Sequence, residues 1–253
     1  MLCKVKVKNI SNNFQEHQFP KAGTSENNMK LSLTFFALII SQLVFCQSKR
    51  GKIILEKDKY GVAYISHDTS RREYSWLIPD DPDEDTERYY YQSYQNIIAD
   101  TNLTLKFQPN PYSLSKWTPL YVIGNKYYLY GPSDWMYSFG YIISDSTIFK
   151  QSSPDPEVYL IVNMKEPSNN EFQFTTINYT KKQIKISIYI IDKTNEIAVW
   201  KFEKENEVDF KLMINSNNIK NFPVVIRTCG KIKCFTEYDF EEPDFEKLIS
   251  NTR

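Results

Sequence analysis

Regular alternation of apolar and polar residues limits what this chain can fold into more than any other feature. QIKISIYIID, residues 183–192, carries isoleucine at every second position from Ile184 to Ile190. EVDFKLMI (207–214) shows the same pattern, and EFQFTTIN (171–178) shows a weaker form of it. Because successive side chains of a strand leave opposite faces of the sheet, these segments are predicted to be half-buried strands.

Short turns separate the predicted strands. Gly124-Asn125 lies between two strand-like runs and indicates a two-residue hairpin, and an earlier hairpin is expected to turn at Asp58–Gly61. From about Trp117 to Phe235 we expect nine or ten strands, with no helix long enough to connect parallel ones. The sequence therefore predicts an all-β fold, an antiparallel up-and-down meander. It would form either a lipocalin-type barrel, which we favour, or a two-layer sandwich.

One or two short helices are expected outside this meander. The segment Glu84–Ala99 spaces its apolar residues by three and four, as an amphipathic helix does, and could cover an open end of the barrel. The C-terminal EEPDFEKLI predicts a second helix with Pro243 in its first turn. The apolar face of the first helix would consist of Tyr90, Tyr94, Ile97 and Ile98.

An apolar segment near the N-terminus predicts export. Leu31–Phe45 follows Lys30 and is shorter than the roughly 20 apolar residues of a membrane-spanning helix. Val44 and Cys46 are small enough for signal peptidase, which would cut before the next residue. We therefore interpret residues 29–46 as a signal peptide. A lipid anchor at Cys46 is less favoured, because the preceding residue is a large phenylalanine.

This interpretation divides the chain into three parts. Residues 1–28 would be a disordered, non-native N-terminal extension, residues 29–46 the signal peptide, and residues 47–253 a single β-rich domain. The mature protein would be secreted, or periplasmic or held in the cell envelope, with no transmembrane span left after cleavage. Over the full chain, 31 basic and 31 acidic residues cancel, and no basic run dominates a segment, which argues against a nucleic-acid partner.

Two cysteines follow the predicted cleavage site, in TCGKIKCF. Cys229 and Cys234 are separated by four residues, a spacing that suits the two sides of a tight hairpin. In an oxidising compartment we expect them to form a disulfide. A zinc site would need two further ligands, and His67 is the single histidine after the cleavage site.

No catalytic residue, metal site or cofactor is assigned from the sequence. DDPDEDTE spaces Asp81, Asp83 and Asp85 like the start of a calcium loop, but it lacks the glycine and the glutamate that such a loop needs. We interpret it as a solvated acidic loop. His67 has no nucleophile-elbow sequence near it, so hydrolytic chemistry there is not expected.

The strongest candidate for a binding site is an aromatic stretch from Trp117 to Tyr141. Its 25 residues include nine aromatics, against 15% in the whole chain. Cross-strand aromatic packing explains this density without any ligand. The functional interpretation is an apolar pocket or a platform for sugar rings. The ligand-binding residues would be Trp117, Tyr128, Tyr130, Trp135 and Tyr137.

Three functions from different classes remain open. The first, which we favour, is an exported, non-catalytic β-domain that binds a small apolar or carbohydrate ligand, or a partner protein, through these aromatics. Replacing Trp117 or Trp135 with alanine should then weaken binding without unfolding the domain. The alternatives are a secreted glycoside hydrolase that uses a pair of carboxylates, and a structural protein of the cell envelope.

Overall fold

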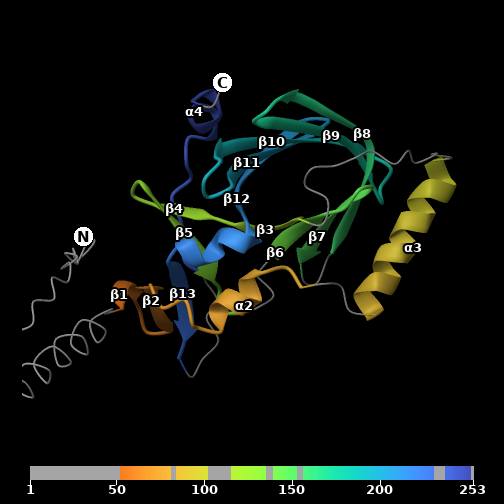
Figure 1. The fold of residues 1–253 in the computed structure, drawn as a ribbon. Helices are drawn as coiled ribbons and strands as arrows, with labels where there is room; N and C mark the ends of the chain where they lie inside the picture. Colours follow the sequence, from red (N-terminus) through yellow and green to blue (C-terminus); the bar gives the residue numbers. More distant parts are fainter. Residues whose placement is uncertain are drawn as a thin grey trace, which may run out of the picture. The chain divides into compact units, whose positions relative to one another are not determined.

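A closed, antiparallel barrel of eight strands is the centre of the structure, which is a computed structural model (Figure 1). The structure describes residues 52–80, 84–101, 115–134, 139–152, 156–230 and 237–251. The predicted leader and both of its boundaries therefore lie outside the described residues. The barrel strands are β3 (Ser115–Pro119), β6 (Phe139–Ile143), β7 (Thr147–Ser152), β8 (Glu157–Ser168), β9 (Glu171–Asn178), β10 (Gln183–Asp192), β11 (Ile197–Lys204) and β12 (Glu207–Asn215).

The barrel follows the predicted up-and-down order with one interruption. From β6 to β12 each strand pairs with the next one along the chain, and β12 closes the ring on β3. Between β3 and β6 the chain leaves the barrel to form the hairpin of β4 (Tyr121–Ile123) and β5 (Lys126–Gly131). Gly124 at the tip of this hairpin has φ 51°, a left-handed conformation that glycine adopts without a steric penalty.

Large apolar side chains fill the inside of the barrel. Ile184, Ile186, Ile188 and Ile190 all point inward from β10, as their alternation predicts. The inward residues of β11 and β12 include Trp200 and Met213, both fully buried. The ring of Trp200 lies 5.0 Å from that of Tyr141, which comes from β6. These contacts make the interior a packed core.

A second sheet of five strands packs against the outer wall of the barrel, and its strand order is β1-β2-β13-β5-β4. It contains β1 (Ile53–Lys57), β2 (Gly61–Ser66) and β13 (Val224–Cys229). Strands from near the start and near the end of the described chain therefore pair within this sheet. Two predicted features are confirmed, the Asp58–Gly61 turn and the Gly124-Asn125 hairpin. The expectation of purely antiparallel pairing is wrong at one place, because β13 runs parallel to β5. From β3 to β13 there are eleven described strands rather than nine or ten.

The layer between the barrel and the second sheet is a separate apolar core. Tyr189, Val199 and Leu212 enter it from the outer face of the barrel, and Leu129 and Ile226 enter it from the sheet. The outer face of β10 was predicted to meet solvent. This core buries Tyr189 there, so the second half of β10 is covered on both sides, while Lys185 near its start is exposed.

Helices lie around the two sheets. The predicted helix is confirmed as α3 (Glu84–Thr101), but it does not cover an open end of the barrel. Its Tyr90 packs edge-on against Phe149, which points outward from β7, so α3 lies on the outer wall (Figure 1). The C-terminal helix α4 (Phe245–Ser250) is capped by Asp244, and Pro243 therefore precedes its first turn. Pattern reasoning missed α2 (Glu73–Leu77) and the 3-10 helix η2 (Ser216–Asn221).

One buried guanidinium ties the first hairpin to β13. The Arg227 side chain is 1% exposed, and its Nη2 donates to Asp58 Oδ2 at 2.8 Å. Asp58 Oδ1 also accepts from the backbone N–H groups of Tyr60 and Gly61, both at 2.7 Å. The hydrogen bond from Arg227 is the main reason that the pKa of Asp58 is lowered, and these two backbone donors add to it.

This lowered pKa predicts a specific loss of stability in acid. A carboxyl whose pKa is lower in the folded state stabilises the fold above its unfolded pKa, about 3.9, and ceases to do so as the pH falls through the folded value. We expect Asp58→Asn to unfold at a lower urea concentration than wild type at pH 6, and the difference to shrink below about pH 4. Urea midpoints measured from pH 2 to 7 test this, with the exposed Asp80→Asn as control. A difference that is constant across that range would contradict it.

Candidate ligand-binding site

The described members of the predicted aromatic site do not lie together. Trp117 is inside the barrel with no exposed surface, and its Nε1 donates to Ser115 Oγ at 2.9 Å. Tyr128 and Tyr130 belong to the second sheet and face away from the barrel, toward Tyr238. They share one face of β5, as residues two apart on a strand do. The two tyrosines belong to the β4–β5 hairpin, which leaves the barrel after β3, whereas Trp117 stays inside the barrel.

Several other predicted residues fall partly or wholly outside the described chain. Trp135 and Tyr137 lie there, so their place in a ligand site stays a prediction. Phe139 and Tyr141, on the same strand as each other, point into the barrel together. Cys229 at the end of β13 is not a free thiol, but Cys234 lies outside the described residues, so their pairing also stays a prediction.

Asp81 and Asp83 of the acidic loop are likewise outside the described chain. Within the described ranges, no group of three or more histidines, cysteines and carboxylates is placed to hold a metal ion. His67 is exposed just after β2, the strand end where the sequence placed it.

A groove between α3 and the outer wall of the barrel is the best candidate for a binding site. Its volume is about 680 Å³, within the range of roughly 300–1,000 Å³ that small-molecule sites occupy. We call it the α3 groove. It is lined by Glu84, Arg88, Tyr90 and Tyr91 of α3, Ile142 of β6, Ser144 of the following turn, and Thr147 and Phe149 of β7.

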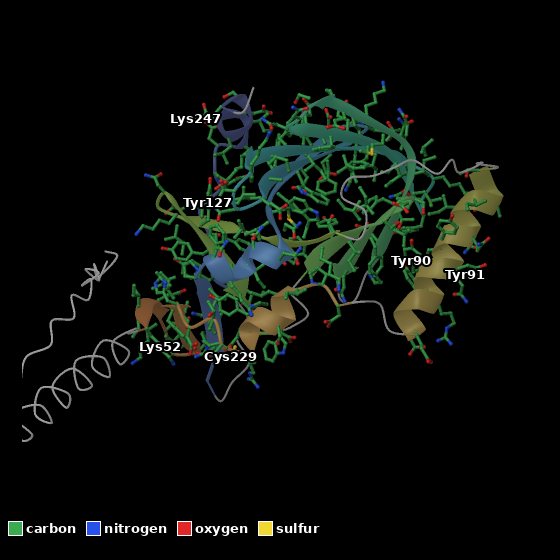
Figure 2. The ribbon with its side chains drawn as sticks, in the orientation of Figure 1. Lys52, Tyr90, Tyr91, Tyr127, Cys229 and Lys247 are labelled. Atoms are coloured by element: carbon green, nitrogen blue, oxygen red, sulfur yellow. The ribbon has the colours of Figure 1, made fainter. Side chains whose placement is uncertain are left out.

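Tyr90 is the aromatic anchor of this groove, and it lies on the side of α3 that faces the barrel (Figure 2). Its ring lies 5.7 Å from the Phe149 ring at an interplanar angle of 79°, an edge-to-face contact. The same ring lies 6.3 Å from that of Tyr94, one helical turn further along. Tyr91, next to the anchor, is 61% exposed. One side of the groove is therefore formed by the packed ring of Tyr90, and the Tyr91 ring beside it is exposed to solvent.

Three hydroxyl groups converge beside this wall. The Tyr90 hydroxyl lies 2.5 Å from Thr147 Oγ1, which in turn lies 2.7 Å from Ser144 Oγ. Ser144 Oγ also accepts from the backbone N–H of Thr147 at 2.9 Å, which fixes the turn. Burial raises the pKa of Tyr90, so its hydroxyl keeps its proton at neutral pH. These groups can exchange hydrogen bonds with a polar substituent of a ligand.

Charge in the α3 groove is confined to the start of the helix. Arg88 pairs with Asp85 at 2.5 Å, but both side chains are largely exposed, so the pair is weak and the guanidinium can turn to a ligand. Glu84 is the one carboxylate among the lining side chains that the structure describes. A glycosidase mechanism needs two carboxyl groups flanking the bond that breaks, so these lining residues do not supply it.

Ionisable groups also gather inside one end of the barrel. Lys150 Nζ lies 3.3 Å from Glu157 Oε2, and this oxygen accepts from the Tyr159 hydroxyl at 2.6 Å. Lys211 Nζ lies 2.8 Å from Asp209 Oδ2. Burial, together with the negative charge of Glu157, raises the pKa of Tyr159. Because each carboxylate has its own lysine, we interpret the cluster as structural ion pairs.

Among the described residues, no helix combines the length and the apolar character needed to cross a membrane. Comparisons of the chain with protein-family models, with curated proteins and with solved structures find no match.

Proposed function

We propose that this protein is an exported, non-catalytic binding protein that holds a small, mainly apolar ligand in the α3 groove. The cavity of about 680 Å³ is the observation that carries the proposal. Its apolar surface comes from Ile142, Phe149 and the rings of Tyr90 and Tyr91. A pocket with an apolar lining and a few convergent polar groups is the usual form of a small-molecule site.

The polar groups define which ligands would fit. The hydroxyls of Tyr90, Ser144 and Thr147 can bind a hydroxyl, carbonyl or carboxylate group, and Arg88 favours a negative charge near the start of α3. A flat ring could stack on the exposed face of Tyr91. The proposal is therefore an aromatic or aliphatic molecule with one polar or anionic end.

Binding of 1-anilinonaphthalene-8-sulfonate, an aromatic anion, tests this site. Tyr91→Ala removes an exposed ring from the groove, and we expect the affinity for this dye to fall about five- to tenfold because one aromatic contact is lost. Stability should hardly change, since the ring is mostly in solvent. Fluorescence titration measures the affinity, and thermal unfolding followed by circular dichroism checks the fold.

Tyr179→Ala is the matched control, because Tyr179 is 57% exposed on the turn after β9 and does not line the α3 groove. It should leave dye affinity at the wild-type value. Equal affinities for wild type and Tyr91→Ala, or equal losses in both variants, would show that the dye does not occupy the α3 groove and would contradict the proposal.

A further inference from the structure

A second cavity lies at the free edge of the second sheet, away from the α3 groove. There the C-terminal segment from Tyr238 to Phe245 passes β4 and the outer face of β12, and encloses about 380 Å³. We call this cavity the edge pocket. Its aromatic lining consists of Tyr121, Phe210, Tyr238, Phe240 and Phe245.

The aromatic rings of the edge pocket are held in place by one another. Tyr121 and Phe240 have ring centroids 4.4 Å apart, and Tyr238 meets Phe240 edge-on at 4.8 Å. On the other side, Phe210 and Phe245 stack at 5.2 Å with an interplanar angle of 9°. Burial raises the pKa of Tyr121 to about 12, and none of the hydrogen bonds between described residues involves its hydroxyl.

The charge of this lining is negative. Asp239, Glu241 and Glu242 contribute carboxylates, while Lys211 is the one basic residue among the lining side chains. The Lys211 ammonium is already paired with Asp209 and lies 5.5 Å from the centre of the Phe139 ring, which belongs to the barrel interior. Glu241 accepts from the Gly124 N–H, whereas Asp239 and Glu242 make no ion pair among the described residues. Among the described residues, two carboxylates beside the aromatic cavity thus have no basic partner.

We propose that the edge pocket binds a small organic cation, an ammonium group carried on an apolar body. Aromatic faces attract cations through the negative face of the ring, and uncompensated carboxylates add a longer-range attraction. The apolar body would occupy the space between the two groups of rings. This site is independent of the α3 groove, which has the opposite charge preference.

Three ligands with similar apolar bodies and different charges test the proposal. We expect 2-phenylethylammonium to bind saturably in calorimetric titration, 2-phenylethanol to bind about tenfold more weakly, and 3-phenylpropanoate not to bind to the edge pocket. Raising the salt concentration should weaken binding of the cation, because the two carboxylates are exposed and screened. Binding of the alcohol as tight as that of the cation, or no binding of the cation, would overturn the proposal.

Variants locate the cation. The double variant Asp239→Asn/Glu242→Gln keeps the size of both side chains and is expected to lower affinity for 2-phenylethylammonium about fivefold. Glu205→Gln/Glu207→Gln removes two exposed acids from the β11–β12 turn and should leave affinity unchanged. Tyr91→Ala in the α3 groove should also bind the cation normally. If Tyr91→Ala loses affinity while the Asp239/Glu242 variant keeps it, the cation binds in the α3 groove and the edge-pocket assignment is wrong.

Discussion

Replacing Trp117 with alanine is expected to lower the free energy of unfolding by about 3–5 kcal/mol, the cost typical of removing a fully buried large aromatic side chain. Trp117 has no exposed surface, and its ring lies 5.6 Å from that of Trp200 in an edge-to-face arrangement. Alanine would leave a cavity in the centre of the barrel and free the Ser115 hydroxyl from its indole partner. The sequence-based expectation that this substitution spares the fold is therefore replaced by one of strong destabilisation.

Urea unfolding followed by circular dichroism measures this loss without depending on tryptophan fluorescence. Trp76→Ala is the matched control, because Trp76 on α2 is 53% exposed and its ring centre lies 4.7 Å from the Arg72 guanidinium carbon. We expect it to change stability by less than about 1 kcal/mol. If the Trp117 variant unfolds at the same urea concentration as the Trp76 variant, then Trp117 does not occupy the barrel core.

Gly140→Ala is expected to destabilise the protein by about 1–3 kcal/mol, although it adds only a methyl group. A Cβ at this position of β6 would lie 2.3 Å from Pro79 Cγ and 2.9 Å from the Trp117 carbonyl oxygen. Neither contact can relax easily, because Pro79 is buried and the carbonyl belongs to the neighbouring strand. A glycine inside a strand often marks a bend or a bulge. The structure explains it instead by close packing of the loop after α2.

Chemical denaturation of two further variants tests this explanation. Gly131→Ala adds the same methyl group where the nearest atoms are 3.6 Å away, so stability should stay the same or rise by about 0.5 kcal/mol. Adding Pro79→Ala to Gly140→Ala removes the closer of the two clashes, so the double variant should lose less than the sum of its single variants. Additive losses would mean that the two residues do not touch.

Local alternation predicted the strands well because it depends only on the geometry of the strand itself. QIKISIYIID, EVDFKLMI and EFQFTTIN fall within β10, β12 and β9, with the isoleucines of β10 facing the core. Alternation does not predict which strand each strand pairs with. The position of β13 between β2 and β5 depends on packing between residues far apart in the sequence, and so does the burial of Tyr189 by the second sheet.

The candidate sites were harder to predict for the same reason. The aromatic stretch from Trp117 to Tyr141 was taken as one site, but the chain crosses from the barrel to the second sheet and back within it. For the α3 groove, the sequence predicts the helix face that carries Tyr90. The polar residues that follow Ile143 indicate the turn that lines the groove. In the sequence, the edge pocket corresponds only to alternating acids and aromatics from Glu237 to Glu241, a pattern that does not by itself indicate a cavity.

The strand order of the second sheet sets limits on the time course of folding. Ser66 of β2 pairs with Val224 of β13, so the first hairpin can gain its neighbour only after almost the entire chain has been synthesised. Pairing over such long separations slows folding, because the entropy of a large loop is lost before the contact forms. Until β13 arrives, one edge of β2 lacks its strand partner and is open to pairing with other chains. We therefore expect newly made protein to be most prone to aggregation during this interval.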